Sequence, residues 1–274
     1  MSLESNPIIK DWISLVNDSD IPLAEKSLKM AQLLEYSDLD INKYIQKISE
    51  LGNAIKSVIP QNDNPKYQLS LLNEEFFHTH KFFGDQEDYY NPQNNFLNAV
   101  IDKKSGLPIT LSILYVEVAK HLGLDLKIVG FPSHIVVKYD EEIILDPFNE
   151  GKLLDIDDLQ AILDRNFGGQ IDFAPEFLDE ITSKMILTRM ARNLKNSYAQ
   201  SYDYKKSKQC VDMVLAVEPD SPEEIRDKGI IEERLGNYEI ATKYLNQYLE
   251  INPNGEDIDF ILELIKSIRT KTSQ

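Results

Sequence analysis

Three points in the middle of the chain carry residues whose types and order suit nucleophilic catalysis. A helix is entered through Gly106-Leu107-Pro108, His134 then begins one expected strand, and Asp146 ends the next strand. A histidine that is hydrogen-bonded to a carboxylate is the usual general base for a side-chain nucleophile. The order therefore permits a base at this place, provided that the two strands bring the imidazole and the carboxylate together.

Pairing of the two strands depends on the turn between them. A three-residue turn over 139–141 pairs Lys138 with Glu142, and it then places His134 directly opposite Asp146. Directly opposed residues share one face of a sheet, with Cβ atoms about 5 Å apart. A change of one residue in the turn would put the two side chains on opposite faces.

Overall composition indicates a soluble, strongly acidic globular protein. The 274 residues are 42% hydrophobic and 27% charged, and 29 basic against 46 acidic side chains give a net charge of −17. Such a charge repels nucleic acid phosphates and anionic lipid, so neither nucleic acid nor a membrane is an expected partner. We expect no membrane span and no signal peptide, and the single cysteine favours a cytoplasmic location.

The first 85 or so residues have helical periodicity. One helix is expected around Trp12, and a second follows Asp20 as its cap. A third is expected from about Asp40 to Val58, and a fourth covers 67–83 and ends at Gly84.

The middle of the chain predicts a helix followed by short strands. The apolar run LPITLSILYVEVAKHLG reads as a helix that ends at Gly123. The runs LKIVGF, HIVVKY and EIILDPF read as strands, and the last two form a hairpin. Helices in front of an antiparallel meander predict an α+β fold with a small antiparallel sheet.

From about Phe177 onward the pattern is helical and it repeats. The segment YDYKKSKQCVDMVLAVEPDSP can be laid over GNYEIATKYLNQYLEINPNGE with an offset of 34 residues, so that Tyr204 falls on Tyr238. That offset is the tetratricopeptide period. Lys195 stands in the first copy where the second has the small residue Gly229, and residues 257–269 are expected to form a capping helix. The expected domains are 1–88 (helical), 89–176 (the core with the sheet) and 177–274 (the repeats).

The segments NNFLNAVIDKKSGLPITLSILYVEVAKHLGL, GFPSHIVVKY and ILDPFNEGKLL resemble the SirB-type branch of the transglutaminase-like superfamily. The resemblance covers roughly residues 94–254. It implies a transglutaminase-like core joined to carboxy-terminal tetratricopeptide repeats. In that superfamily a cysteine opens a helix, where the helix dipole lowers the thiol pKa, and a histidine and an aspartate follow on strands.

Carried over to this chain, the resemblance makes His134 the histidine and Asp146 the aspartate, and the nucleophile position falls on Pro108 or within one residue of it. Proline offers no thiol. SirB-type sequences commonly show this Gly-x-Pro pattern, so the resemblance implies a branch that has lost the cysteine.

Other side chains near the helix start are poor substitutes for that thiol. Thr110 points away from the Pro108 side of the helix and Ser112 lies one turn further on, and an unactivated hydroxyl is a weak nucleophile. Cys210 lies in the first repeat, where we interpret it as a small buried hydrophobe. The His134 and Asp146 side chains themselves could form a buried structural pair, line a retained binding pocket, or still take part in catalysis.

Two functions are consistent with these features. One is a non-enzymatic regulatory or scaffold protein that binds a protein or peptide partner through its repeats, where Arg192 and Asn196, one helical turn apart, could hold a partner's carboxylate. The other is a thiol-transferase or amidase-like enzyme that uses His134 and Asp146 with an unrecognised nucleophile. No cofactor and no metal site are expected, because the four histidines are scattered.

Overall fold

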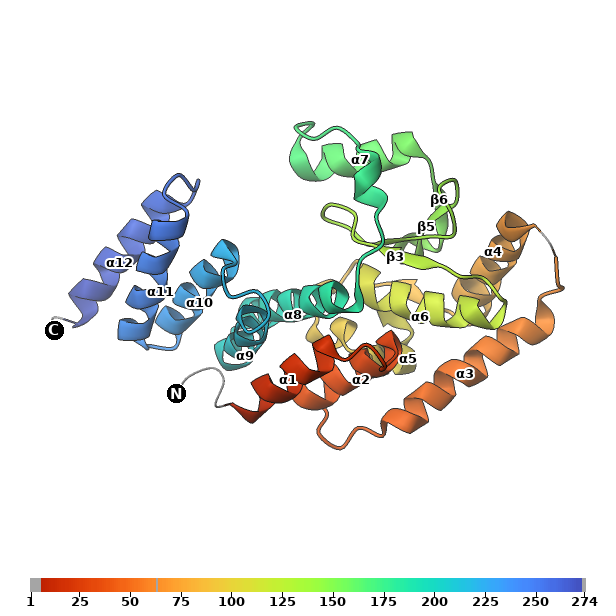
Figure 1. Cartoon of the computed structure of the whole chain (residues 1–274), viewed down its shortest axis with the longest axis horizontal. Coiled ribbons are helices and arrows are strands. Elements are labelled where there is room, and N and C mark those ends of the chain that lie inside the picture. The colour runs from red at the N-terminus through yellow and green to blue at the C-terminus, as the bar shows by residue number, and fades with distance from the viewer. Residues whose placement is uncertain (1–5, 63, 273–274) are drawn as a thin grey trace. The chain divides into compact units, whose positions relative to one another are not determined.

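The computed structural model describes residues 6–62 and 64–272. These residues form two compact units. The core unit is Asp18–Leu187, and the repeat unit joins the described residues of Met1–Asn17 to those of Thr188–Gln274. Figure 1 shows that both are built mainly of helices and that the antiparallel strands belong to the core unit. The division into three domains at residues 88 and 176 stays a prediction.

The amino-terminal half of the core unit is helical, as predicted. Asp40 caps the helix that follows it, because its carboxylate accepts a hydrogen bond from the Lys43 N–H. Within the described residues, no helix combines the length and the apolar character that a membrane crossing needs. The helices are α2 (Leu23–Leu34), α3 (Ile41–Val58), α4 (Pro65–Asn73), the π-helix η2 (Glu74–Thr79), the 3-10 helix η3 (Pro92–Asn95), α5 (Leu97–Lys103) and α6 (Pro108–His121).

Two predicted boundaries in this half are wrong. Helix α2 begins only at Leu23, because Pro22 has an extended backbone that precedes the first turn, so Asp20 is not its cap. The helix expected over 67–83 ends earlier, since α4 passes into the π-helix and Phe83–Gly84 forms strand β1. Strand β1 pairs in parallel with β2 (Ser105–Gly106).

Helix α6 forms the centre of the core unit. Pro108 occupies its first turn, where a missing N–H costs nothing, and the helix ends before Gly123, whose φ of +77° suits a residue without a side chain. Tyr115 is fully buried and contacts the rings of Phe76 and Phe77 from the π-helix. The helix predicted for the run LPITLSILYVEVAKHLG is confirmed.

A four-stranded antiparallel sheet follows α6, in the order β3-β4-β5-β6. The sequence predicted the first three strands, but it did not predict β6 or α7. Apolar side chains of α7, among them Leu159 and Leu163, share a hydrophobic core with Val136 and Ile144 of the sheet. The elements are β3 (Lys127–Val129), β4 (Val136–Lys138), β5 (Ile144–Asp146), the 3-10 helix η4 (Pro147–Asn149), β6 (Lys152–Leu154), α7 (Ile156–Phe167) and the 3-10 helix η5 (Pro175–Leu178).

The repeat unit consists of helical hairpins, and the predicted fold class is confirmed in both units. Helices α9 and α11 begin at Tyr204 and Tyr238, the two residues that the repeat aligns. Trp12 of α1 is buried here and donates its indole N–H to the Met213 carbonyl at 2.8 Å. The helices are α1 (Pro7–Asn17), α8 (Ser183–Gln200, which spans the division between the units), α9 (Tyr204–Leu215), α10 (Pro222–Arg234), α11 (Tyr238–Ile251) and α12 (Ile258–Thr272), the expected capping helix.

Candidate functional site

The His134 imidazole and the Asp146 carboxylate are in contact. His134 Nε2 lies 2.8 Å from Asp146 Oδ2, and both side chains are largely buried, at 15% and 3% exposed. Asp146 ends strand β5, whereas His134 lies in the turn that precedes β4 and donates its backbone N–H to the Phe131 carbonyl. The pair that the sequence permitted is therefore present.

The strand register that was expected to bring them together is wrong. Lys138 pairs with Ile144 and not with Glu142, so the two strands are offset by two residues from the predicted pairing. An offset of two preserves the face on which each side chain lies. His134 therefore reaches Asp146 from the turn before the strand, and the two residues are not direct cross-strand partners.

The offset arises because the three-residue turn lies one residue further along the chain than predicted, over 140–142 and not over 139–141. The turn closes where the Tyr139 N–H donates to the Ile143 carbonyl at 3.0 Å, so it holds three residues between these two. Asp140 stabilises it, since its carboxylate Oδ1 accepts hydrogen bonds from the N–H groups of Glu142 and Ile143. Aspartate side chains commonly organise turns in this way.

Asp146 is the polar centre of the site. Its Oδ2 accepts a second hydrogen bond from Asn149 Nδ2 at 2.7 Å, and its Oδ1 accepts from the N–H groups of Phe148 and Asn149. Burial alone would raise the pKa of Asp146, but the hydrogen bonds from His134 and Asn149 outweigh it and hold this pKa below its usual value. The ionised carboxylate accepts a hydrogen bond from the Nε2–H group of His134. In the neutral imidazole with its proton on Nε2, Nδ1 carries the free lone pair and can accept a hydrogen bond.

A chain of hydrogen bonds from the centre of the unit fixes the backbone around Asp146. Tyr115 of α6 donates to Asn73 Oδ1 at 2.6 Å, and Asn73 Nδ2 donates to the Gly151 carbonyl at 2.8 Å. The Gly151 N–H then donates to the Asp146 carbonyl at 2.8 Å. Gly151 has a φ of +70°, and a Cβ there would lie 2.1 Å from Asn73 Oδ1, so this position requires glycine.

Strand β1 packs against the segment that follows Asp146, at Phe148. A Cβ on Gly84 would lie 2.3 Å from the Phe148 carbonyl oxygen. Because a backbone atom must then move, we expect Gly84→Ala to lower the free energy of unfolding by about 3 kcal/mol. Chemical denaturation measures this loss, and the Nε2 proton resonance of His134 should broaden or shift with it. Gly123→Ala is the control, since a Cβ there meets nothing within 4 Å and only the left-handed backbone is strained. A loss no larger than that of the control would contradict the proposed support.

A cleft of about 670 Å³ opens beside the pair. Its aromatic wall is formed by Tyr89, Tyr90 and Phe148, and the Phe148 ring meets the His134 ring edge to face at 6.4 Å. Arg165 of α7 also lines the cleft and forms no ion pair within the part of the chain that the structure describes. Sequence reasoning missed these residues, although two consecutive tyrosines in the polar loop DQEDYYNPQNN were a visible signal.

The start of α6 does not present a nucleophile to this cleft. Pro108 is buried and is not among the residues that line it. The Thr110 hydroxyl accepts from the Leu107 N–H and donates to the Asn94 carbonyl at 2.8 Å. Ser112 is fully buried, and its hydroxyl has no hydrogen-bond partner among residues 6–62 and 64–272. Neither hydroxyl lines the cleft.

Cys210 is a buried side chain of helix α9 in the repeat unit, as expected. It is 0% exposed, and burial raises the pKa of its thiol well above the usual value. A thiol in such surroundings stays protonated at neutral pH and is unreactive.

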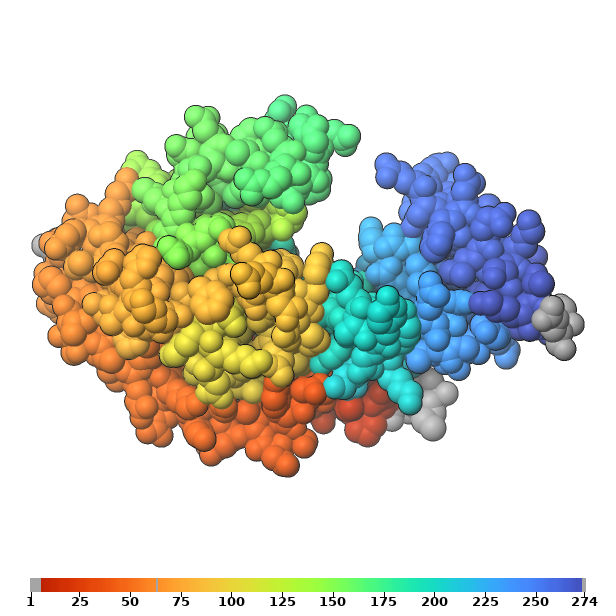
Figure 2. Space-filling view, turned by 180° about the vertical axis from the view of Figure 1, so that it is seen from behind, coloured from red at the N-terminus to blue at the C-terminus, as the bar shows by residue number. Residues whose placement is uncertain are grey.

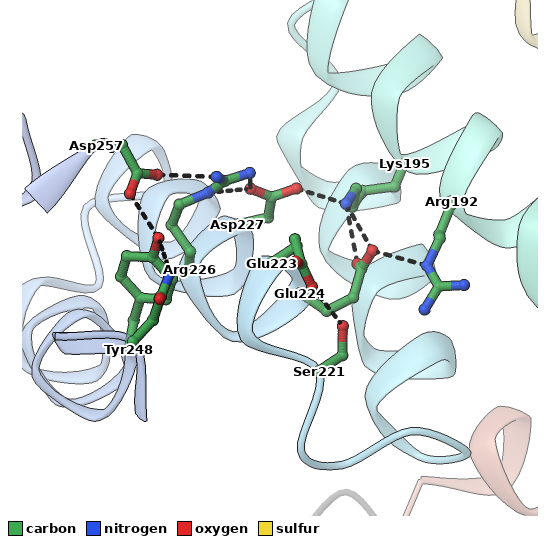
Figure 3. Close-up of polar contacts among 10 residues, drawn as sticks. Arg192, Lys195, Ser221, Glu223, Glu224, Arg226, Asp227, Tyr248 and Asp257 are labelled. Atoms are coloured by element: carbon green, nitrogen blue, oxygen red, sulfur yellow. Dashed lines mark hydrogen bonds and ion pairs between the residues drawn. The ribbon is translucent and has the colours of Figure 1, made fainter. Parts of the chain in front are cut away.

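Arg192 and Asn196 both lie on helix α8, but their surroundings differ. The Arg192 guanidinium contacts Glu224 at 3.1 Å and also pairs with Glu218, whereas Asn196 is exposed. Figure 3 shows Arg192 and Lys195 directed at the same carboxylate of Glu224. Carboxylates of its own chain thus already contact this arginine, and a shared role with Asn196 in partner binding stays a prediction.

In the part of the chain that the structure describes, the acidic and histidine side chains are dispersed. Across residues 6–62 and 64–272, no three His, Cys, Asp or Glu side chains gather in a way that could hold a metal ion. His121 Nδ1 lies 3.2 Å from Asn53 Oδ1, and His78 Nε2 lies 3.9 Å from Glu150, so these two histidines have separate partners.

Comparison with known families agrees with the two parts of this architecture. The sequence model described as the transglutaminase-like superfamily matches residues 42–192, and a tetratricopeptide repeat model matches residues 194–266. The first match thus includes α3 and α4 as well as α6 and the sheet. No solved structure gives a significant match.

Curated relatives match along most of the chain. A UPF0162 protein of Xylella fastidiosa (strain 9a5c) is 31% identical over 258 residues, which cover 91% of this chain and 92% of the relative. A UPF0162 protein of Vibrio cholerae is 30% identical over 246 residues, covering 88% and 87%. F-box only protein 21 of Mus musculus is 28% identical over 168 residues, which cover 56% of this chain but only 26% of that protein.

Proposed function

This chain belongs to the transglutaminase-like superfamily, and on that premise we propose that it is a non-enzymatic regulatory or scaffold protein of the SirB type. In this proposal the cleft beside His134 and Asp146 is a binding site that has lost its cysteine nucleophile. The tetratricopeptide region provides a second surface for a protein partner, since such repeats commonly mediate protein interactions.

The main support for the proposal is the set of groups that contact the His134 imidazole. Within the described residues, His134 Nδ1 has no hydrogen-bond partner, and the helix that would offer a thiol begins with a buried proline, Pro108. A general base must lie within hydrogen-bond reach of the proton that it removes. Among the described residues no nucleophile is hydrogen-bonded to this base, which favours binding over covalent catalysis.

The chemistry of the cleft suits a peptide segment. Tyr89 and Tyr90 are 37% and 50% exposed and offer apolar ring faces that hold a contact with little loss of side-chain entropy. His134 Nδ1 can accept a hydrogen bond, and Arg165 can donate several. A segment with an apolar side chain next to a polar group would fit these features.

The alternative function is a thiol-transferase or amidase-like enzyme that uses an unrecognised nucleophile or an activated water. The 2.8 Å contact between His134 Nε2 and Asp146 favours it, because this contact fixes the orientation of the imidazole and leaves Nδ1 able to accept a hydrogen bond. The same contact serves a binding site equally well.

Assays of amine incorporation and of amide and thioester hydrolysis distinguish the two. We expect the full chain, His134→Ala and Cys210→Ser all to stay at the uncatalysed background rate, because no nucleophile among the described residues is hydrogen-bonded to His134. Positioned acid–base groups usually contribute about 10²–10⁴-fold, so even a partial activity would be measurable. Turnover that disappears in His134→Ala and persists in Cys210→Ser would establish the enzyme instead.

Binding to an array of random peptides tests the positive part of the proposal. We expect Tyr90→Ala to weaken capture of the selected peptides by about tenfold or more, as loss of an aromatic anchor usually does. Tyr202→Ala is the matched control, since this tyrosine is 79% exposed and lies in the repeat unit. Equal effects of the two substitutions would mean that the cleft is not the binding surface.

A further inference from the structure

A second pocket of the core unit has a composition that the proposed function does not use. It has a volume of about 470 Å³ and is lined by α3, the end of α5, the segment 80–82 and Leu114 of α6. It shares no lining residue with the cleft beside His134. Figure 2 shows the orange surface of α3 beside the yellow surface around α5, and the two helices are in contact.

Most of the pocket wall is apolar. Ile48, Phe82, Ile101 and Leu114 all line it, and each is at most 7% exposed. Pockets for small molecules are typically 300–1,000 Å³ with a mainly apolar lining and a few placed polar groups. This pocket therefore has both the size and the lining of a small-molecule site.

Lys104 places its charged ammonium group over the apolar lining, at the Phe82 ring. Its ammonium nitrogen lies 4.2 Å from the centre of the Phe82 ring, and the residue is half-buried. No carboxylate within residues 6–62 and 64–272 forms an ion pair with it. Burial, followed by the charge of Lys47, lowers the pKa of Lys104, and the charge of Asp102 opposes this shift in part.

The other ionisable side chains at this pocket leave Lys104 as its lysine without an ion-pair partner among the described residues. Lys47 is neutralised by Asp102 at 2.5 Å, and Glu50 is exposed and accepts a hydrogen bond from Gln46. His80 lines the pocket close to Lys104, and burial, followed by the Lys104 charge, lowers its pKa. One ammonium without an ion pair among the described residues and one neighbouring imidazole thus line the same pocket.

Left-handed backbone occurs at Lys104, the C-cap of α5, and at Lys81, which follows His80. Lys81 and Lys104 have φ values of +63° and +66°, which residues other than glycine rarely adopt. His80 directly follows the π-helix η2, and the Phe83 N–H donates to the Lys104 carbonyl at 2.9 Å, which joins the two segments. Left-handed residues and single π-turns are concentrated at ligand sites.

We propose that this pocket binds a small amphiphilic anion, an aliphatic or aromatic carboxylic acid, with its carboxylate on Lys104 and His80 and its carbon body against Phe82 and Leu114. A carboxylate provides an ion-pair partner for Lys104. A phosphate would bring a second negative charge, and Asp102 and Glu50 at the same pocket oppose two charges more strongly than the single charge of a carboxylate. The proposal concerns a different site and does not depend on the function of the His134 cleft.

Titration of the full chain with octanoate, followed by calorimetry and by the His80 ring resonances, tests the proposal. We expect saturable binding with a Kd of about 1 mM or tighter, and we expect octan-1-ol and octylamine to bind at least about tenfold more weakly. Lys104→Gln should weaken octanoate binding by about tenfold or more. Lys103→Gln, an exposed neighbour that does not line this pocket, should change it less than twofold.

Lys104→Gly separates binding from folding. Glycine adopts the left-handed backbone without strain, so this variant should stay folded and still lose octanoate binding. The proposal is overturned if octylamine or octan-1-ol binds as tightly as octanoate, if no binding occurs by about 10 mM, or if Lys104→Gly binds like the unaltered chain.

Discussion

Asp146→Ala is expected to lower the free energy of unfolding of the core unit by about 3 kcal/mol. Asp146 is 2% exposed, and its carboxylate accepts hydrogen bonds from His134, from Asn149 and from two backbone N–H groups. Removing it leaves buried donors without an acceptor, which costs more than the net value of the hydrogen bonds. Urea or guanidinium denaturation measures the change.

Asp140→Ala is a matched control from the same hairpin. Asp140 also accepts two backbone N–H groups, from Glu142 and Ile143, but it is exposed and has no contact with the histidine. Its loss should cost about 1 kcal/mol or less, because water replaces the missing acceptor. Equal costs for the two substitutions would contradict the view that the buried pair with His134 stabilises the site.

The same carboxylate predicts part of the pH dependence of stability. The folded pKa of Asp146 lies below the unfolded value of about 3.9, so the folded state prefers the ionised form. Its contribution is complete above the unfolded pKa and is lost as the pH falls through the folded pKa. The unaltered chain should therefore lose stability below about pH 4, and Asp146→Asn should lose less over the same interval. Parallel curves for the two proteins would contradict the depressed pKa.

The sequence carried enough information to find the site but not its register. Helix α6 and strands β3 to β5 follow from long apolar runs, and these alone bring His134 near Asp146. The residue at which a turn begins depends on local hydrogen bonds, here those of Asp140, and composition does not specify them. The predicted pair survived because the error was two residues, which keeps side chains on the same face.

The residues that surround the pair were harder to predict. Tyr89 and Tyr90 reach the cleft from a loop, and the position of a loop depends on the elements that it joins. Helix α7 was readable from its cap Asp155 and the spacing of Leu159 and Leu163, so that omission was avoidable. Pocket residues such as His80 and Lys104 come from segments 24 residues apart, with no shared motif.

The binding partners of the charged residues in the repeats could not be predicted from the sequence. Arg192 has the side chain and the spacing expected of a residue that binds a partner's carboxylate, yet Glu224 and Glu218 of its own chain contact it. A sequence shows that an arginine can bind a carboxylate, but it does not show whether that carboxylate belongs to the same chain or to a partner. Lys195 poses the same question, because it stands where the repeat period expects a small residue.

Lys195→Met is expected to lower the free energy of unfolding of the repeat unit by about 3–4 kcal/mol. Lys195 is 4% exposed and donates to both carboxylate oxygens of Glu224, at 3.0 and 2.9 Å, and to Asp227 (Figure 3). Glu224 is itself 2% exposed, so its negative charge would stay buried with less compensation. Thermal and chemical denaturation measure the loss.

Two further variants identify the origin of that loss. Lys205→Met removes an exposed lysine from the next helix and should change stability by less than about 0.5 kcal/mol. Adding Glu224→Gln and Asp227→Asn to Lys195→Met should recover about 2 kcal/mol, since no uncompensated carboxylate then remains at this position. A triple variant that is less stable than the single one would mean that Lys195 acts through packing rather than through charge.

The stability of Lys195→Gly tests why the first repeat has a lysine where the second has Gly229. At the aligned position of the second repeat, a Cβ on Gly229 would lie 2.7 Å from Leu245, so α10 and α11 approach closely there. In the first repeat Val211 aligns with Leu245, and Lys195 fills this position with a charged side chain bound to α10. Like methionine, glycine would leave the carboxylates of Glu224 and Asp227 without Lys195. It would also remove side-chain volume, and its low helix propensity would cost about 1 kcal/mol more. We therefore expect Lys195→Gly to be less stable than Lys195→Met, and the reverse order would show that α8 and α9 can adopt the closer packing of the second repeat.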